Sequence, residues 1–149
     1  MFLVLGVTVS GQDFDLLLKG GHLIDGKNRI SAVRDVAIKD GKIAAIGEIA
    51  ADRAAKTVNV RGLYVTPGLI DIHVHVFAGT GERNSYAGDN SVYPDGFTLR
   101  NGVTTVADAG SAGWRNFEDF HARIIGRSRT RVLSFLNIVG AGMRGGQYE

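Results

Sequence analysis

A run of ten residues, 67–76, most constrains what this chain can fold into. It reads PGLIDIHVHV and carries two histidines two positions apart. The apolar residues predict a strand, and side chains on a strand alternate between its two faces. Asp71, His73 and His75 are therefore expected on one face, with the even-numbered apolar residues buried on the other. Polar side chains on such a strand need polar partners, and two imidazoles one pleat apart can reach one metal ion.

Residues 13–66 have the pattern of β structure. Asp40-Gly41 joins two alternating apolar runs, and Asp-Gly in that position is a strong hairpin signal. Gly20-Gly21 interrupts another apolar run, which predicts a bulge or turn between two strand segments. No grouping of catalytic side chains occurs here, so this segment is expected to be scaffold.

After residue 67 the pattern changes to strand, loop and helix. Strands are expected at residues 69–76, 104–108 and 132–139, the last of them buried on both faces. Pro94 is a good first residue for a short helix that ends by Gly102. Asn116 can cap a second helix, in which Phe117, Phe120 and Ile124 form an apolar stripe. Strands separated by helices imply a parallel sheet with right-handed crossovers, so three βα units are expected.

Two of these segments resemble a known family. Residues 65–75 (VTPGLIDIHVH) resemble the first-strand signature of the amidohydrolase superfamily, and residues 102–113 (GVTTVADAGSAG) resemble the second strand in its deacetylase and dihydroorotase-like branch. The resemblance runs from about residue 15 to residue 147. It implies a metal-dependent hydrolase built on a (β/α)₈ barrel, with a small β-sandwich formed largely from the segment before the barrel.

The length of the chain limits how much of such a barrel it can form. A complete (β/α)₈ barrel needs roughly 250 residues, whereas the chain has 149. The expected fold is therefore α/β, with a β-sandwich segment at residues 13–66. The first three βα units of an incomplete TIM-type barrel follow at residues 67–149. On this interpretation the chain is the amino-terminal part of something longer.

The first twelve residues leave the location of the protein open. Residues 1–12 contain a short apolar run followed by small residues, as at the end of a secretory signal peptide, but lack a positively charged start. A first strand of the sandwich, or a start codon assigned late within a longer leader, would explain the same run. The location is thus cytoplasmic or, with a truncated signal peptide, exported or periplasmic. The run is too short to span a bilayer.

Composition excludes several classes of partner and site. The 17 basic and 15 acidic residues leave a net charge of +2, too small to indicate nucleic acid. The absence of cysteine excludes disulfides and thiolate metal sites. A Gly-x-Gly-x-x-Gly match at residues 140–145 lacks the acidic residue expected about 20 positions on, so dinucleotide binding is not expected. Whether the protein forms a homo-oligomer stays open.

The candidate site lies at the end of the first predicted barrel strand, where the active sites of such barrels lie. His73 and His75 are the predicted metal ligands, and zinc is the expected ion because neutral imidazole suits it. A catalytic zinc activates water and polarises a carbonyl, which indicates hydrolysis of an amide or ester. The other two histidines, His22 and His121, are expected to be packing or surface residues.

Two aspartates are weaker candidates. By the resemblance, Asp71 belongs to the motif without being a usual ligand, so it is expected to orient an imidazole N–H or to act structurally. Asp108 ends the second strand, at the rim of the site. There it could contact substrate, hydrogen-bond to a metal-ligating side chain, or cap the loop at residues 109–113.

The resemblance implies more than this chain contains. A dinuclear member would add a bridging carboxylated lysine, two further histidines and a late aspartate as general base, and no residue here matches them. The chain alone is therefore expected to be inactive, and the full-length protein to hold two zinc or other divalent ions. The implied substrate is an acylated small molecule or a cyclic amide. Ala109-Gly110-Ser111 favours the deacetylase-like alternative, because dihydroorotase-like relatives tend to carry a Met-Pro-Asn type sequence there. An inactive fragment, or a non-catalytic binding module that keeps the strand-one metal site, is the competing interpretation.

Overall fold

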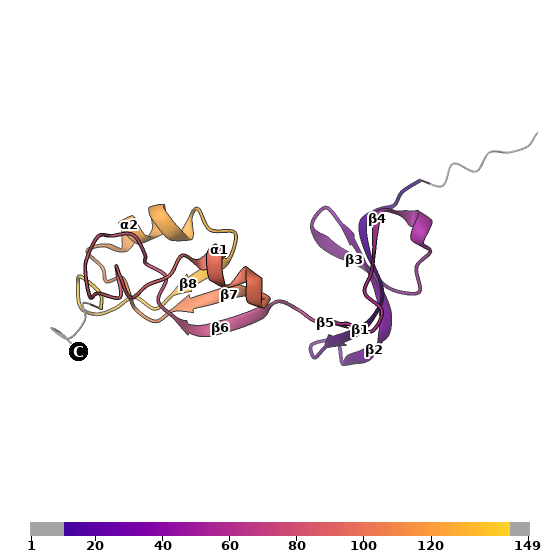
Figure 1. Cartoon of the computed structure of the whole chain (residues 1–149), viewed down its shortest axis with the longest axis horizontal. Coiled ribbons are helices and arrows are strands. Elements are labelled where there is room, and N and C mark those ends of the chain that lie inside the picture. Colours follow the sequence, from indigo (N-terminus) through magenta and orange to yellow (C-terminus); the bar gives the residue numbers. More distant parts are fainter. Residues whose placement is uncertain (1–10, 144–149) are drawn as a thin grey trace, which may run out of the picture. The chain divides into compact units, whose positions relative to one another are not determined.

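The computed structural model describes residues 11–143 (Figure 1). All but the last two residues of the candidate signal-peptide remnant, residues 1–12, lie outside this range, as do the last two positions of the Gly-x-Gly-x-x-Gly match. The chain divides into two compact units between Pro67 and Gly68, whereas the sequence pattern placed the boundary one residue earlier. Within the described range, no helix combines the length and the apolar character needed to cross a membrane.

The first unit is a mixed β-sheet. Its elements are β1 (Phe14–Asp25), β2 (Ile30–Lys39), β3 (Lys42–Gly47), the 3₁₀ turn η1 (Ala51–Arg53), β4 (Ala54–Asn59) and β5 (Tyr64–Val65). The strand order is β3-β2-β1-β4, and β5 also pairs with β1. β4 runs parallel to the first half of β1, and β5 runs parallel to its second half. The five strands described for this unit thus belong to one sheet, and the second layer of a sandwich stays a prediction.

Two local predictions for this sheet are confirmed. Asp40 and Gly41 have φ values of 51° and 70°, as the tight turn between β2 and β3 requires. The pairing of β1 with β2 shifts register between Leu18 and Gly21, which is the predicted bulge. A Cβ at Gly21 would lie 2.6 Å from Cγ2 of Val65. Glycine at position 21 therefore lets β5 approach β1.

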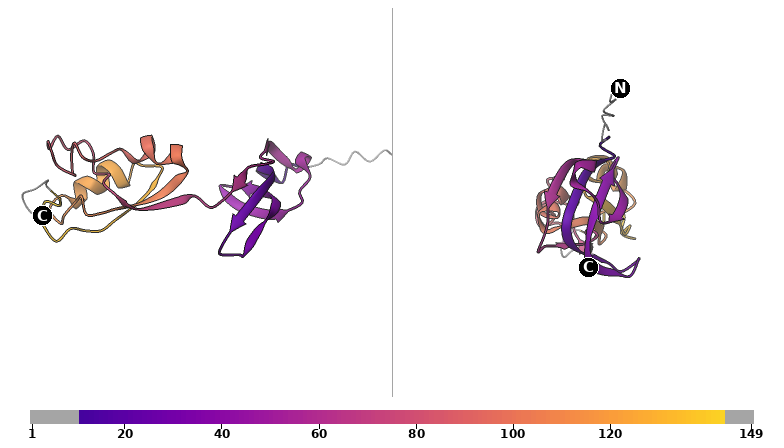
Figure 2. Two further views of the ribbon diagram at one scale, coloured as in Figure 1. Left: turned by 60° about the horizontal axis from the view of Figure 1, so that its bottom comes forward. Right: turned by 90° about the vertical axis from the view of Figure 1, so that its right-hand side faces the viewer.

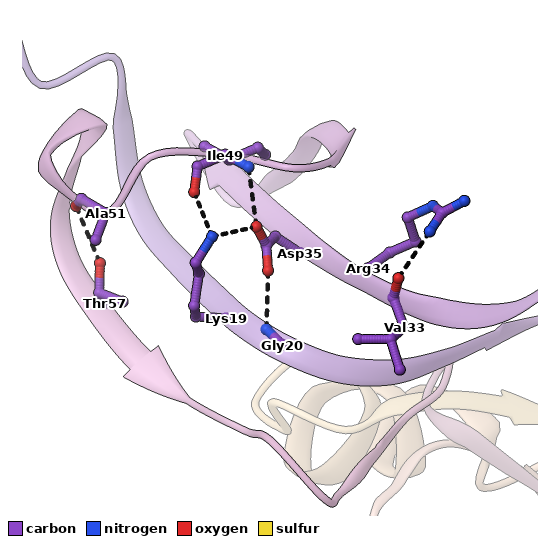
Figure 3. Close-up of polar contacts among 8 residues, drawn as sticks. All are labelled: Lys19, Gly20, Val33, Arg34, Asp35, Ile49, Ala51 and Thr57. Carbon is purple, nitrogen blue, oxygen red and sulfur yellow. Dashed lines mark hydrogen bonds and ion pairs between the residues drawn. The ribbon is translucent and has the colours of Figure 1, made fainter.

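A buried carboxylate joins three segments of the first unit (Figure 3). Asp35 of β2 accepts hydrogen bonds from Lys19 Nζ at 2.6 Å, from the backbone N–H of Gly20 at 2.8 Å and from that of Ile49 at 2.9 Å. Lys19 Nζ also donates to the carbonyl of Ile49 at 2.7 Å. Burial disfavours the charged form of Asp35, but these hydrogen bonds and the Lys19 charge outweigh it and hold its pKa below the usual value.

We expect Asp35→Asn to lower the free energy of unfolding of this unit at pH 7 by about 1–3 kcal/mol, because an amide cannot accept all three donors. An aspartate with a lowered folded pKa contributes stability that is present above its unfolded pKa of about 3.9. That contribution is lost as the pH falls through the folded value. The variant should therefore lose less stability than the unaltered chain on acidification below about pH 4.

Urea unfolding at pH 7 and at about pH 2.5 measures both effects. Asp52→Asn, which alters an exposed aspartate of η1, is the matched control. An Asp35→Asn chain that loses as much stability on acidification as the unaltered chain would show that Asp35 contributes nothing to the acid dependence.

The second unit alternates strands and short helices. Its elements are β6 (Leu69–Val74), α1 (Pro94–Phe97), the 3₁₀ turn η2 (Leu99–Asn101), β7 (Val103–Asp108), α2 (Phe117–Phe120), the π-helical turn η3 (His121–Ile125) and β8 (Arg131–Ser134). The three strands form a parallel sheet in the order β6-β7-β8. The helical segments lie on one side of this sheet (Figures 1 and 2). The predicted α/β class is confirmed, and strand residues outnumber helical residues in the described range.

The core of this unit confirms the predicted helix faces. Phe120 and Ile124 are buried against Val106 of β7 and Val132 of β8. The ring of Phe120 also packs on that of Phe77, with centroids 4.8 Å apart. The earlier helix begins at Pro94 as predicted and continues as a 3₁₀ turn to Gly102, whose φ is 75°.

Two burial predictions are wrong. Ile70 and Ile72 of β6 were expected to be buried, but 65% and 75% of their surfaces are exposed. The third strand, expected to be buried on both faces to residue 139, ends at Ser134, and Ile138 is 94% exposed. The physical reason is the same in both places. β6 and β8 are the edges of the described sheet, and the buried core of this unit lies on its helical side.

Candidate metal centre

His73 and His75 lie together at the carboxyl end of β6. His73 belongs to the strand, and His75 follows its last residue, Val74. The two imidazole centroids are 5.7 Å apart, and the ring planes meet at 80°. His73 is exposed and His75 is half-buried. The His-x-His spacing thus places two imidazoles side by side at the end of a parallel strand, where the sequence predicted a metal site.

Asp71 contacts the backbone of the same strand. Its Oδ1 accepts a hydrogen bond from the backbone N–H of His73 at 3.0 Å. The register of β6 against β7 also shifts between Asp71 and Val74. The carboxylate therefore supports an irregular stretch of strand that leads into the histidine pair. This contact is made to the backbone of His73, and the predicted role of Asp71 in orienting an imidazole N–H stays a prediction.

Asp108 ties the loop after β6 to the loop after β7. It is fully buried at the end of β7. Its Oδ2 accepts the backbone N–H of Val76 at 2.8 Å, and its Oδ1 accepts that of Ser111 at 2.7 Å. Asp108 thus caps the following loop, one of the roles that its sequence position allowed. The same carboxylate also holds the residue after His75.

Ser111 and Tyr86 also contact the ring of His75. Ser111 Oγ lies 2.9 Å from His75 Nδ1, and Ser111 is fully buried. The ring of Tyr86 lies 4.3 Å from that of His75, centroid to centroid, at a tilt of 38°. Neither residue was predicted to belong to the site. Ser111 lies in the second-strand motif and could have been considered, whereas Tyr86 lies in a polar loop without a signal.

The loops that follow the three strands contact one another. The N–H of Asn137, after β8, donates to the carbonyl of Ala112, after β7, at 3.0 Å. Ser85, after β6, donates through Oγ to the carbonyl of Met143 at 3.1 Å. A Cβ at Gly113 would lie 1.9 Å from the carbonyl oxygen of Val139, so only glycine permits this approach. The loops that follow β6, β7 and β8 are therefore held close together by these contacts.

The residues of this centre fit part of a zinc site. Neutral imidazole nitrogens are good zinc ligands, and a tetrahedral ion takes four ligands. Residues 11–143 contain no group of three or more His, Cys, Asp and Glu side chains arranged to hold an ion. His73 and His75 can therefore supply two ligands, and any further protein ligands would have to come from outside the described residues.

The other two histidines have packing or surface positions, as expected. His22 of β1 is half-buried, with Nε2 3.1 Å from Ser31 Oγ and its ring 5.4 Å from that of Tyr64. His121 is exposed at the start of η3. Neither belongs to the pair at the end of β6.

Similar proteins are known for this chain, although no family model matches it. A deacetylase of Agrobacterium fabrum is 38% identical over 120 residues, which are 79% of this chain and 28% of that protein. A solved dihydroorotase superposes with a TM-score of 0.70 at 34% identity, covering 85% of this chain and 32% of the other. An N-acyl-D-glutamate deacylase from Bordetella bronchiseptica, solved with zinc and a phosphonate inhibitor, gives a TM-score of 0.51 at 29% identity. That match covers 69% of this chain and 19% of the deacylase.

The chain spans less than a third of the length of these proteins. Over the matched residues the sequence is 29–38% identical to theirs, and the fold superposes on the two solved structures with TM-scores of 0.70 and 0.51. The chain therefore belongs to the amidohydrolase superfamily and matches the amino-terminal part of its members.

Proposed function

We propose that this chain is the amino-terminal part of a metal-dependent hydrolase. The reaction is cleavage, by water, of a carbon–nitrogen amide bond or an acyl ester bond in a small molecule. The observation that supports this most directly is the pair His73 and His75, with ring centroids 5.7 Å apart at the carboxyl end of a parallel strand. Residues 67–149 would contribute the first three βα units of the barrel, and residues 13–66 the β-sandwich segment.

In this proposal His73 and His75 would hold one of two zinc ions, and the remaining protein ligands would come from later strands. Such an ion would supply the activation of water and the polarisation of the scissile carbonyl. The residues of this chain hold and orient the ligands. Asp71 fixes the backbone of His73, and Asp108 fixes the backbone that follows His75. Asp108 is fully buried, so we assign it to positioning rather than to substrate contact.

An acylated small molecule is the proposed substrate class, in preference to a cyclic amide. Two observations favour it: the Ala109-Gly110-Ser111 sequence after β7, and the similarity to a protein named as a deacetylase. Half-buried Tyr86 packs on His75 and places an aromatic ring beside the predicted metal ligands. An aromatic ring in this position can pack against an acyl chain or a flat amide of the substrate.

The test uses the complete protein that carries this sequence. We expect it to bind zinc and to hydrolyse N-acetylated or O-acetylated small molecules faster than cyclic amides such as dihydroorotate. A chelator should abolish the activity, and added zinc should restore it. A folded protein that binds zinc without hydrolysing any of these compounds would support the competing proposal of a non-catalytic module. A protein that binds no zinc would contradict both.

A further inference from the structure

We propose that Ser111 is a positioning residue for His75. Its hydroxyl oxygen accepts the Nδ1–H of the imidazole, which leaves Nε2 as the unprotonated nitrogen that binds the ion. This inference rests on the proposed function, because it assumes that His75 is a metal ligand. It adds a residue from the loop after β7 to a centre whose predicted metal ligands come only from the first strand.

The position of Ser111, and so of its hydroxyl, is fixed by the buried carboxylate of Asp108. Ser111 Oγ lies 2.9 Å from His75 Nδ1. Its backbone N–H donates to Asp108 Oδ1 at 2.7 Å, and the other oxygen of Asp108 holds Val76, the neighbour of His75. Ser111, Asp108 and Val76 are all fully buried. One buried carboxylate therefore sets both the backbone after the histidine and the serine that contacts its ring.

The direction of this hydrogen bond decides which nitrogen can bind a metal. A neutral imidazole carries one N–H and one lone pair, and the partner of one nitrogen determines the state of the other. If the serine hydroxyl donates to Nδ1, the proton of the neutral ring is on Nε2, which then cannot bind a metal. If Nδ1–H donates to Oγ, Nε2 carries the lone pair. Only the second arrangement lets His75 act through Nε2, and metal-bound histidines generally donate their other N–H in this way.

Tyr86 restricts the ring from a second direction. Its ring lies 4.3 Å from that of His75, centroid to centroid, and the planes are tilted by 38°. The loop that carries it is anchored through Ser85, whose Oγ bonds to the carbonyl of Met143. A hydrogen bond at Nδ1 and a ring contact on the face leave the imidazole little freedom to rotate. Ser111 and Tyr86 thus hold the imidazole ring in one orientation in the metal-free protein.

The first experiment compares zinc affinities by chelator competition in the complete protein that carries this sequence. We expect Ser111→Ala to weaken zinc binding by about 10-fold to 100-fold, which is the usual effect of losing a side chain that hydrogen-bonds to a metal ligand. Ser128→Ala is the matched control. It removes a serine hydroxyl that bonds the carbonyl of Ile124 at 2.8 Å, in the same unit, and should leave the affinity unchanged. Equal affinities for Ser111→Ala and the unaltered protein would overturn the proposal.

The second experiment needs no variant, so it remains decisive even if Ser111→Ala fails to fold. Nitrogen NMR of histidine-labelled, metal-free protein reports which nitrogen of His75 carries the proton. We expect Nδ1–H in the unaltered protein and a mixture of both forms in Ser111→Ala. A proton on Nε2 of the unaltered protein would refute the proposal. If His75 itself proved unnecessary for zinc binding, the proposed function would fail, whatever the proton position.

Discussion

Asp108→Ala should lower the free energy of unfolding of the second unit by about 2–6 kcal/mol, because it leaves two buried N–H groups without an acceptor at about 1–3 kcal/mol each. These donors are the backbone N–H groups of Val76 and Ser111, both fully buried. Asp108→Asn keeps the size of the side chain but turns an NH₂ group toward one of the donors. We therefore expect it to recover only part of the loss.

Urea unfolding measures the change, and amide hydrogen exchange at Val76 and Ser111 locates it. Both amides should exchange slowly in the unaltered protein and faster in the variant. Asp89→Ala is the matched control, because exposed Asp89 accepts one long backbone hydrogen bond, 3.3 Å from the N of Asn84. It should change stability by no more than about 0.5 kcal/mol. An Asp108→Ala chain as stable as this control would contradict the role assigned to the carboxylate.

Replacing either histidine of the pair should have the largest effect on the metal. We expect His73→Asn and His75→Asn each to weaken zinc binding by more than about 100-fold. This loss is larger than the loss caused by removing a residue that only hydrogen-bonds to a metal ligand. The reason is that each change removes a direct donor, and asparagine offers an amide that is a poorer zinc ligand than imidazole. Hydrolysis of acylated substrates should fall with zinc content and should not return when zinc is added at concentrations that saturate the unaltered protein.

The measurement is zinc content after dialysis against a graded series of chelator concentrations, in the complete protein that carries this sequence. His121→Asn makes the same substitution at an exposed position of η3 and should leave zinc content unchanged. If the pair variants kept their zinc, His73 and His75 would be two histidines with packing and hydrogen-bonding roles only.

Local signals allowed much of this fold to be predicted. Asp40-Gly41 specifies its hairpin because both positions need positive φ, which few other pairs adopt readily. The stripe that contains Phe120 and Ile124 specifies the buried helix face for a similar reason, since it depends only on helical periodicity. The histidine pair follows from strand alternation and from the position of His75 directly after the last residue of β6.

The failures concern contacts between distant segments. Apolar composition predicted burial for Ile72 and Ile138, yet burial depends on what covers a residue, and that information is not local. The contact of Ser111 with His75 joins residues 36 positions apart in the chain. It follows from the parallel pairing of β6 with β7, which brings the ends of both strands to one edge of the sheet. Strand register could have indicated it; residue type alone could not.

The close packing of the loops after β6, β7 and β8 has an evolutionary consequence. Gly142 would place a Cβ 2.1 Å from the carbonyl oxygen of Ser111, and Gly113 is equally confined against Val139. An insertion in one of these loops would therefore displace the backbone of its neighbour and, through Ser111, the imidazole of His75. Relatives that share this arrangement should diverge in substrate preference by exchanging side chains such as Tyr86 at constant loop length. Lengthened loops in this part of the barrel should be rare among them.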